Sequence, residues 1–77
     1  DAKSKLQEWV QGVWQVTPHY QVLTEWGPEH AKTFVIAALM GEQEIGRGEG
    51  RTKRDAEQAA AQRALTRLDP RATQERA

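Results

Sequence analysis

The sequence predicts a small α+β domain in which two helices pack on one face of a three-stranded antiparallel sheet. Three observations lead to this expectation. A stretch near the start and an alanine-rich stretch that begins near residue 52 both repeat with helical periodicity. Between them lie three short β-favourable segments bounded by turn residues. Neither helix is amphipathic enough to be stable alone, so we expect both to cover one sheet face, in the order α-β-β-β-α.

The first helix is expected over roughly residues 4–14, because the apolar residues of this stretch recur on one helical face. Pro18 then breaks the chain. Residues 20–24 are β-favourable and alternate in polarity, so they predict the first strand. Gly27-Pro28 forces a loop after it.

Residues 33–40 form an apolar run of eight residues, a length that favours a strand over a helix. Gly41-Glu42 suits a two-residue type II′ hairpin. Residues 43–49 are then the return strand.

The last helix is expected over residues 52–68, because Asp69-Pro70 ends the periodic pattern there. Residues 70–77 show no periodicity, and we expect a flexible C-terminal tail. The folded domain is therefore expected to comprise residues 1–69.

Small residues predict how the last helix meets the sheet. Three glycines of the third strand recur at period two, and three alanines of the last helix recur at i+4. Small faces on both partners would permit a close approach. The alternative is a phosphate-cradling loop, although the spacing matches neither G-x-G-x-x-G nor a Walker A loop. The residues concerned are Gly46, Gly48, Gly50, Ala56, Ala60 and Ala64.

Composition excludes several classes of site. The 77 residues contain no cysteine, so disulfides and thiolate metal sites are excluded. His19 and His30 are isolated, and no paired-carboxylate spacing occurs, so we expect neither a catalytic residue nor a bound metal. No apolar run is long enough to span a membrane. We expect a cytoplasmic protein without a membrane partner.

The start of the last helix carries the clearest indication of a ligand. The net charge is zero, but residues 47–54 hold four bases and one acid. Thr52 is a suitable N-cap, which places Lys53 and Arg54 in the first turn, where each cation costs about 0.3–1 kcal/mol against the helix macrodipole. A docked phosphate would reverse this effect. The alternative is a pair of solvated surface charges.

Two further patches could contact the same ligand. Four polar residues fall in one arc of the first helix, where Glu8 could accept a hydrogen bond from a ribose 2′-OH. The stiff loop at residues 27–32 offers His30 as a donor or an acceptor. A solvated helix face and an ordinary hairpin loop are the alternatives. A-form RNA presents two shallow minor grooves on either side of phosphates that line a deep major groove.

The motifs that carry these patches resemble the double-stranded RNA-binding domain. They are Leu6-Gln7-Glu8-Trp9, residues 27–34 and the glycine- and alanine-rich residues 46–60. The resemblance covers residues 1–68, and the most similar copy is the one at the C-terminus of bacterial ribonuclease III. That family has the α-β-β-β-α fold. Three positions depart from the common pattern: Arg54, where many members have lysine; Glu57, where many eukaryotic members have a base although bacterial enzymes often have an acid; and Trp26, where small or polar residues are more usual.

The resemblance also implies which residues meet the RNA. It implies Ser4, Gln7, Glu8 and Gln11 at the first minor groove, Pro28, Glu29 and His30 at the second, and Thr52, Lys53 and Arg54 at the major-groove phosphates.

The acidic nuclease motif of ribonuclease III is absent, so we expect this chain to bind duplex RNA and not to cut it. Its role would be to raise substrate affinity for a tethered catalytic domain, with which it could be in contact. We expect no cofactor for this domain, magnesium only for the catalytic domain of the parent protein, and a monomeric isolated domain. The alternative is a protein-interaction or dimerisation domain of the same fold without RNA binding, suggested by Val35 and Leu39 on the open sheet face.

Overall fold

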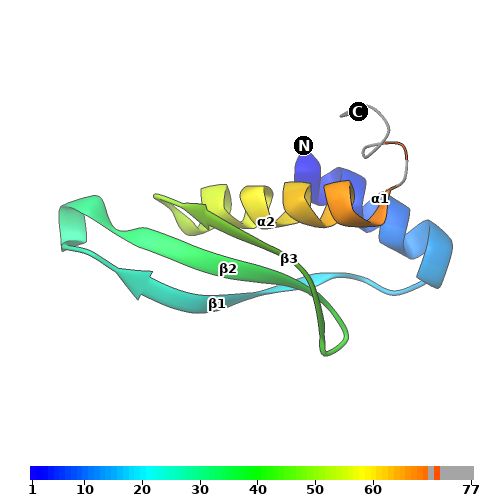
Figure 1. Ribbon diagram of the computed structural model, residues 1–77, viewed down its shortest axis with the longest axis horizontal. Coiled ribbons are helices and arrows are strands. Elements are labelled where there is room, and N and C mark those ends of the chain that lie inside the picture. The colour runs from blue at the N-terminus through cyan, green and yellow to red at the C-terminus, as the bar shows by residue number, and fades with distance from the viewer. Residues whose placement is uncertain (70, 72–77) are drawn as a thin grey trace.

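Two helices lie on the same side of a three-stranded antiparallel sheet (Figure 1). The computed structural model describes residues 1–69 and 71, and the tail expected at 70–77 lies outside them except for Arg71. The sheet order is β1-β2-β3. The α-β-β-β-α prediction is thereby confirmed. The elements are α1 (Ala2–Trp14), β1 (His19–Trp26), the 3₁₀ turn η1 (Glu29–Ala31), β2 (Thr33–Met40), β3 (Gln43–Gly50) and α2 (Lys53–Leu68).

Helix α1 begins two residues earlier than the apolar pattern predicts. Asp1 is its N-cap, and the Asp1 carboxylate accepts a hydrogen bond from the backbone N–H of Ser4 at 2.8 Å. The helix ends at Trp14, and its C-cap Gln15 has a left-handed φ of 61°. The apolar residues gave the wrong start because the first turn is held by polar groups, which do not contribute to hydrophobic periodicity.

The two hairpins of the sheet have different connections. Strand β1 extends to Trp26 and is longer than the predicted residues 20–24. Its pairing with β2 shifts in register between Val22 and Thr24. Met40 pairs with Gln43 across a two-residue loop. Gly41 has a positive φ of 64°, whereas the φ of Glu42 is not positive. This combination agrees with the predicted type II′ turn.

The glycines of β3 allow α2 to lie directly on the sheet. A Cβ added at Gly46 would stand 2.5 Å from the carbonyl oxygen of Ala60, and one added at Gly48 would overlap the backbone of Ala59 and Ala60. Gly50 meets the start of α2 in the same way. The packing interpretation is confirmed, and the phosphate-loop alternative is wrong, because the helix backbone fills the space above these glycines.

The core lies between the helices and the sheet. Its fully buried side chains include Leu6 and Val10 of α1 and Ile45 of β3, which surround the alanine face of α2. On the opposite sheet face Val35 and Leu39 are half-buried rather than open. Trp26, the most exposed of the large apolar side chains within residues 1–69 at 60%, pairs with Thr33 and so lies on this same face. Within residues 1–69, neither helix is long and apolar enough to cross a membrane.

Candidate nucleic-acid interface

The polar arc of α1 forms a continuous exposed surface. All four predicted residues are exposed and line one shallow hollow: Ser4, Gln7, Glu8 and Gln11. Lys3 borders this arc, because the helix includes the turn that the sequence pattern left out. The arc therefore has a cation at its edge, next to hydroxyl and amide groups that can both donate and accept.

The start of α2 presents two free backbone donors. The hydroxyl oxygen of Thr52 accepts from the N–H of Asp55 at 3.0 Å, and the carbonyl oxygen of Thr52 accepts from the N–H of Ala56. Within residues 1–69 no acceptor is present for the N–H groups of Lys53 and Arg54, as expected for the first turn of a helix. Both side chains are exposed. These charges and N–H groups make the turn suited to a phosphate.

The third patch is the turn η1, which two features hold in shape. Gly27 has a φ of 101°, where a Cβ would also meet the carbonyl oxygen of Ala31. Pro28 is the N-cap and accepts from the N–H of Ala31 at 2.8 Å. Glu29 and His30 are exposed beyond it. The loop is thus ordered by its own backbone and leaves the His30 ring available to a ligand.

An ion pair joins η1 to the end of β1. The Lys32 ammonium lies 2.9 Å from a carboxylate oxygen of Glu25 and 3.5 Å from one of Glu29. The hydrogen bond from Lys32 lowers the pKa of Glu25 and raises the pKa of Lys32. Glu25 therefore stays ionised, but the adjacent ammonium offsets the repulsion it would exert on a phosphate at Lys53.

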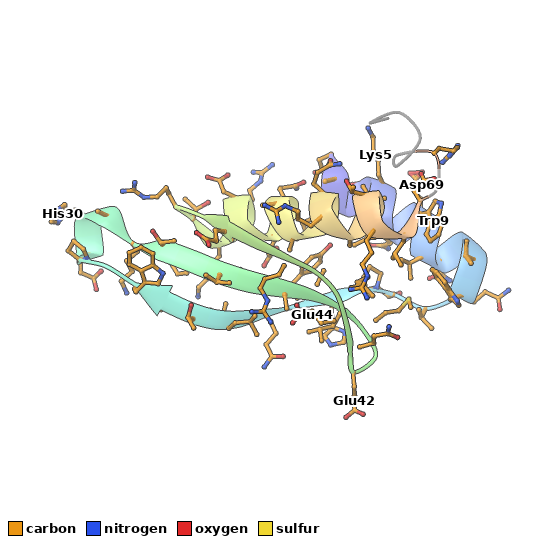
Figure 2. The ribbon with its side chains drawn as sticks, in the orientation of Figure 1. Lys5, Trp9, His30, Glu42, Glu44 and Asp69 are labelled. Atoms are coloured by element: carbon orange, nitrogen blue, oxygen red, sulfur yellow. The ribbon has the colours of Figure 1, made fainter. Side chains whose placement is uncertain are left out.

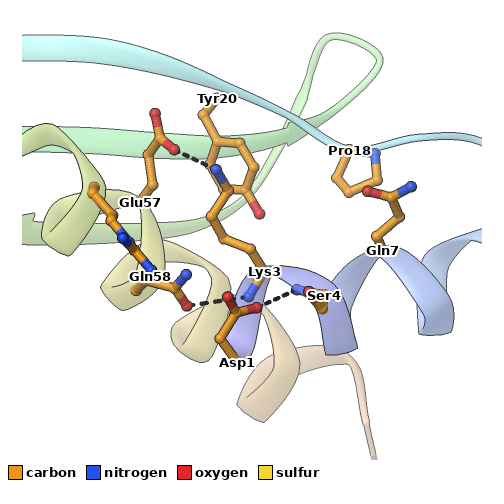
Figure 3. A pocket seen from close by; sticks show the side chains of 9 residues that line it. Asp1, Lys3, Ser4, Gln7, Pro18, Tyr20, Glu57 and Gln58 are labelled. Atoms are coloured by element: carbon orange, nitrogen blue, oxygen red, sulfur yellow. Dashed lines mark hydrogen bonds and ion pairs between the residues drawn. The ribbon is translucent and has the colours of Figure 1, made fainter.

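The fold brings the three patches onto one side of the molecule. One hollow is lined by Ser4 and Gln7 of α1 together with Arg54 of α2 (Figure 3). A second is lined by Glu29 and His30 together with Lys53. Because Lys53 and Arg54 are consecutive, the two hollows meet at the start of α2. His30 lies at one end of the long axis and α1 extends toward the other (Figure 2).

The remaining predicted residues border these hollows. Glu8 and Gln11 continue the α1 arc, Pro28 begins η1, and Thr52 caps α2. Thr52 uses its oxygen for the cap, so its hydroxyl proton is what remains for a ligand.

Of the four bases counted in residues 47–54, three line the hollows at the start of α2 and one does not. Arg51 lines the hollow beside His30, and Lys3, which the sequence pattern did not indicate, lines the one beside Arg54. Arg47 instead forms a two-bond pair with Glu44, with its Nε at 3.0 Å and its Nη2 at 2.9 Å. It borders a different hollow, with Arg63. The cationic patch is therefore Arg51, Lys53 and Arg54, without Arg47.

The sequence is similar to curated proteins that share this region. Residues 2–68 match the family model described as the double-stranded RNA binding motif. Ribonuclease 3 of Protochlamydia amoebophila is 48% identical over 67 residues, which is 87% of this chain and 28% of that protein. Ribonuclease 3 of Streptococcus equi subsp. zooepidemicus is 47% identical over 68 residues, 88% of this chain and 30% of that protein. The chain thus spans less than a third of the length of these relatives.

Solved structures agree with the fold. Dicer from Pichia stipitis matches with a TM-score of 0.72 and 32% identity, over 90% of this chain and 33% of that one. HYL1 from Arabidopsis, described in connection with miRNA processing, matches with a TM-score of 0.74 and 31% identity, over 87% of this chain and 94% of that one. Together with the match over residues 2–68, these similarities show that the chain belongs to the family of double-stranded RNA-binding domains.

Proposed function

We propose that this domain is the substrate-binding module of a ribonuclease III-type endoribonuclease. It binds double-stranded RNA. The α1 arc contacts one minor groove, η1 contacts the next, and the start of α2 bridges the phosphates between them. The supporting observation is the pair of adjoining hollows, which places Lys53 and Arg54 between Gln7 and His30.

The arrangement favours RNA over DNA for a physical reason. Lys53 and Arg54 can contact the phosphates of either duplex, because RNA and DNA carry the same backbone charge. The α1 arc presents amide, hydroxyl and carboxylate groups, which can bond the 2′-OH that only RNA has. Affinity therefore comes largely from α2, and selectivity from α1.

The test is a titration of the domain with RNA duplex, DNA duplex and single-stranded RNA at several salt concentrations. We expect the tightest binding to the RNA duplex and a steep loss of affinity with salt. Lys53→Ala should weaken binding to all RNA sequences alike and lower the salt slope by about 1, because one phosphate contact is removed.

Arg63→Ala is the matched control, since it removes one cation from the same helix at the hollow shared with Arg47. Its salt slope should equal that of the unmodified domain. Equal slopes for Lys53→Ala and Arg63→Ala would remove Lys53 from the phosphate contacts. A domain that ignores every RNA duplex and dimerises with concentration in gel filtration would contradict the proposal and support the interaction-domain alternative.

A further inference from the structure

The N-terminus of α1 is tied to α2 by a side chain 55 residues away. The Oε1 atom of Gln58 accepts from the N–H of Ala2 at 3.0 Å and from the N–H of Lys3 at 3.3 Å. Asp1 accepts from the next N–H, that of Ser4. The orphan donors of this helix end are therefore satisfied within the protein. In contrast to the start of α2, the start of α1 is closed to an external anion.

A second contact joins the same two helices. The Lys3 ammonium lies 2.5 Å from a carboxylate oxygen of Glu57, and it also stands 5.0 Å from the centre of the Tyr20 ring (Figure 3). Both side chains of the ion pair are partly buried, with 37% and 26% of their surface exposed. We call Lys3, Glu57 and Gln58 the α1 latch. Glu57 thus has a partner in this chain.

The latch lies between two of the RNA-contacting patches. Gln58 follows Arg54 by one helical turn on α2, and its partners Ala2 and Lys3 immediately precede Ser4 on α1. The hollow that contains Ser4, Gln7 and Arg54 is lined by all three latch residues. The latch therefore fixes where the α1 arc stands relative to the phosphate-binding turn.

We infer that Gln58 is a positioning residue for duplex selectivity, because it sets the offset between the minor-groove surface of α1 and the phosphate-binding start of α2. This inference rests on the proposed function. A-form and B-form duplexes differ in the spacing of groove and phosphates, so a loosened α1 would lose its 2′-OH contacts while the α2 contacts persist. The preference for RNA over DNA should then fall more than the electrostatic attraction of α2 for the phosphates.

The test compares three variants of the domain with RNA and DNA duplexes. Gln58→Leu keeps a similar volume and removes the acceptor. Gln58→Glu keeps an acceptor for both N–H groups, and its charge suits a helix N-terminus. Leu65→Val is the stability control, because Leu65 is a core residue that lines no hollow with Arg54. All titrations are made at a temperature where circular dichroism shows each variant folded.

We expect Gln58→Leu to lower the RNA-to-DNA preference by about fivefold, the size of one lost hydrogen bond, with an unchanged salt slope. Its amide protons at Ala2 and Lys3 should exchange faster with solvent. Gln58→Glu should retain the preference even if its charge weakens binding to both duplexes alike. The effect of Gln7→Ala should shrink in the Gln58→Leu background, because the two changes remove the same contacts.

Two results would overturn the inference. One is a Gln58→Leu domain that keeps the RNA-to-DNA preference of Leu65→Val, and the other is a Gln58→Glu domain that loses the preference as Gln58→Leu does. Either would leave the proposed function intact if the unmodified domain still prefers duplex RNA. An unmodified domain that binds no duplex would refute the proposed function itself.

Discussion

Tyr20 has a buried hydroxyl group for which the structure offers no hydrogen-bond partner within residues 1–69 and 71. An unsatisfied buried hydroxyl destabilises the folded state. The aromatic ring stabilises it, because the ring packs against the core and the Lys3 ammonium. We predict that Tyr20→Phe leaves the free energy of unfolding unchanged or raises it by up to about 1 kcal/mol. Urea unfolding followed by circular dichroism measures this. A loss above about 1 kcal/mol would mean that the hydroxyl has a bonded partner in solution.

The same residue predicts a change in stability at alkaline pH. Burial, with a smaller contribution from the Glu57 charge, raises the pKa of Tyr20 to about 12. The folded state then holds its proton where the unfolded state, with a pKa of about 10, releases it. Stability should therefore be fully present below pH 10 and fall as the pH rises toward 12, less steeply in Tyr20→Phe. Tyr20 is the sole tyrosine in the sequence, so tyrosinate absorbance reports its pKa directly.

Single residues also show what the sequence could and could not predict. The sequence predicts the N-cap at Thr52 and the first-turn positions of Lys53 and Arg54, as the structure has them. This is possible because N-cap chemistry depends on neighbours within four residues. The pairing of Lys3 with Glu57 spans 54 residues, so no local pattern contains it. Periodicity alone also could not show that Arg47 lies outside the cationic patch. Its partner Glu44 is brought near by the register shift between β2 and β3.

At the scale of elements, the close contact of β3 with α2 gives a prediction with a built-in control. A methyl group at Gly48 would overlap the backbone of Ala59 and Ala60, which cannot move without displacing the helix. We predict that Gly48→Ala lowers the free energy of unfolding by about 3 kcal/mol. In Gly12→Ala the methyl group meets nothing within 4 Å, so the change should stabilise α1 by about 0.5–1 kcal/mol.

Thermal unfolding of both variants measures the difference. Equal effects of the two substitutions would show that β3 and α2 adapt to the added methyl group. The sequence predicted this contact because the glycine and alanine repeats are each visible within one element. It predicted the start of α1 less well, because polar groups hold that end, among them Gln58 of another element.

At the scale of the whole molecule, the charge distribution explains why a chain without net charge has a cationic surface. Acids neutralise bases outside the first turn of α2, as Glu44 does for Arg47 and Glu57 does for Lys3. Lys53 and Arg54 form no ion pair within residues 1–69 and 71. The attraction for RNA is therefore local, and formal net charge alone could not predict it.

The spread of the patches along the molecule predicts how affinity depends on duplex length. The longest extent of the fold is 39 Å, and His30 lies at one end of it (Figure 2). Domains that contact two successive minor grooves cover about 16 base pairs. On a duplex of that length, Gln7→Ala and His30→Ala should each weaken binding by about threefold, because each removes contacts at a different groove.

On a duplex of half that length, only one of the two variants should still weaken binding, since only one minor groove is within reach of the protein. Lys53→Ala is the control: it should weaken binding at both lengths, because Lys53 lies between the two patches and needs only the phosphates beside either groove. Fluorescence anisotropy with duplexes of both lengths measures all three. If Gln7→Ala and His30→Ala both keep their full effects on the short duplex, the two patches contact the same groove, and the two-groove arrangement is wrong.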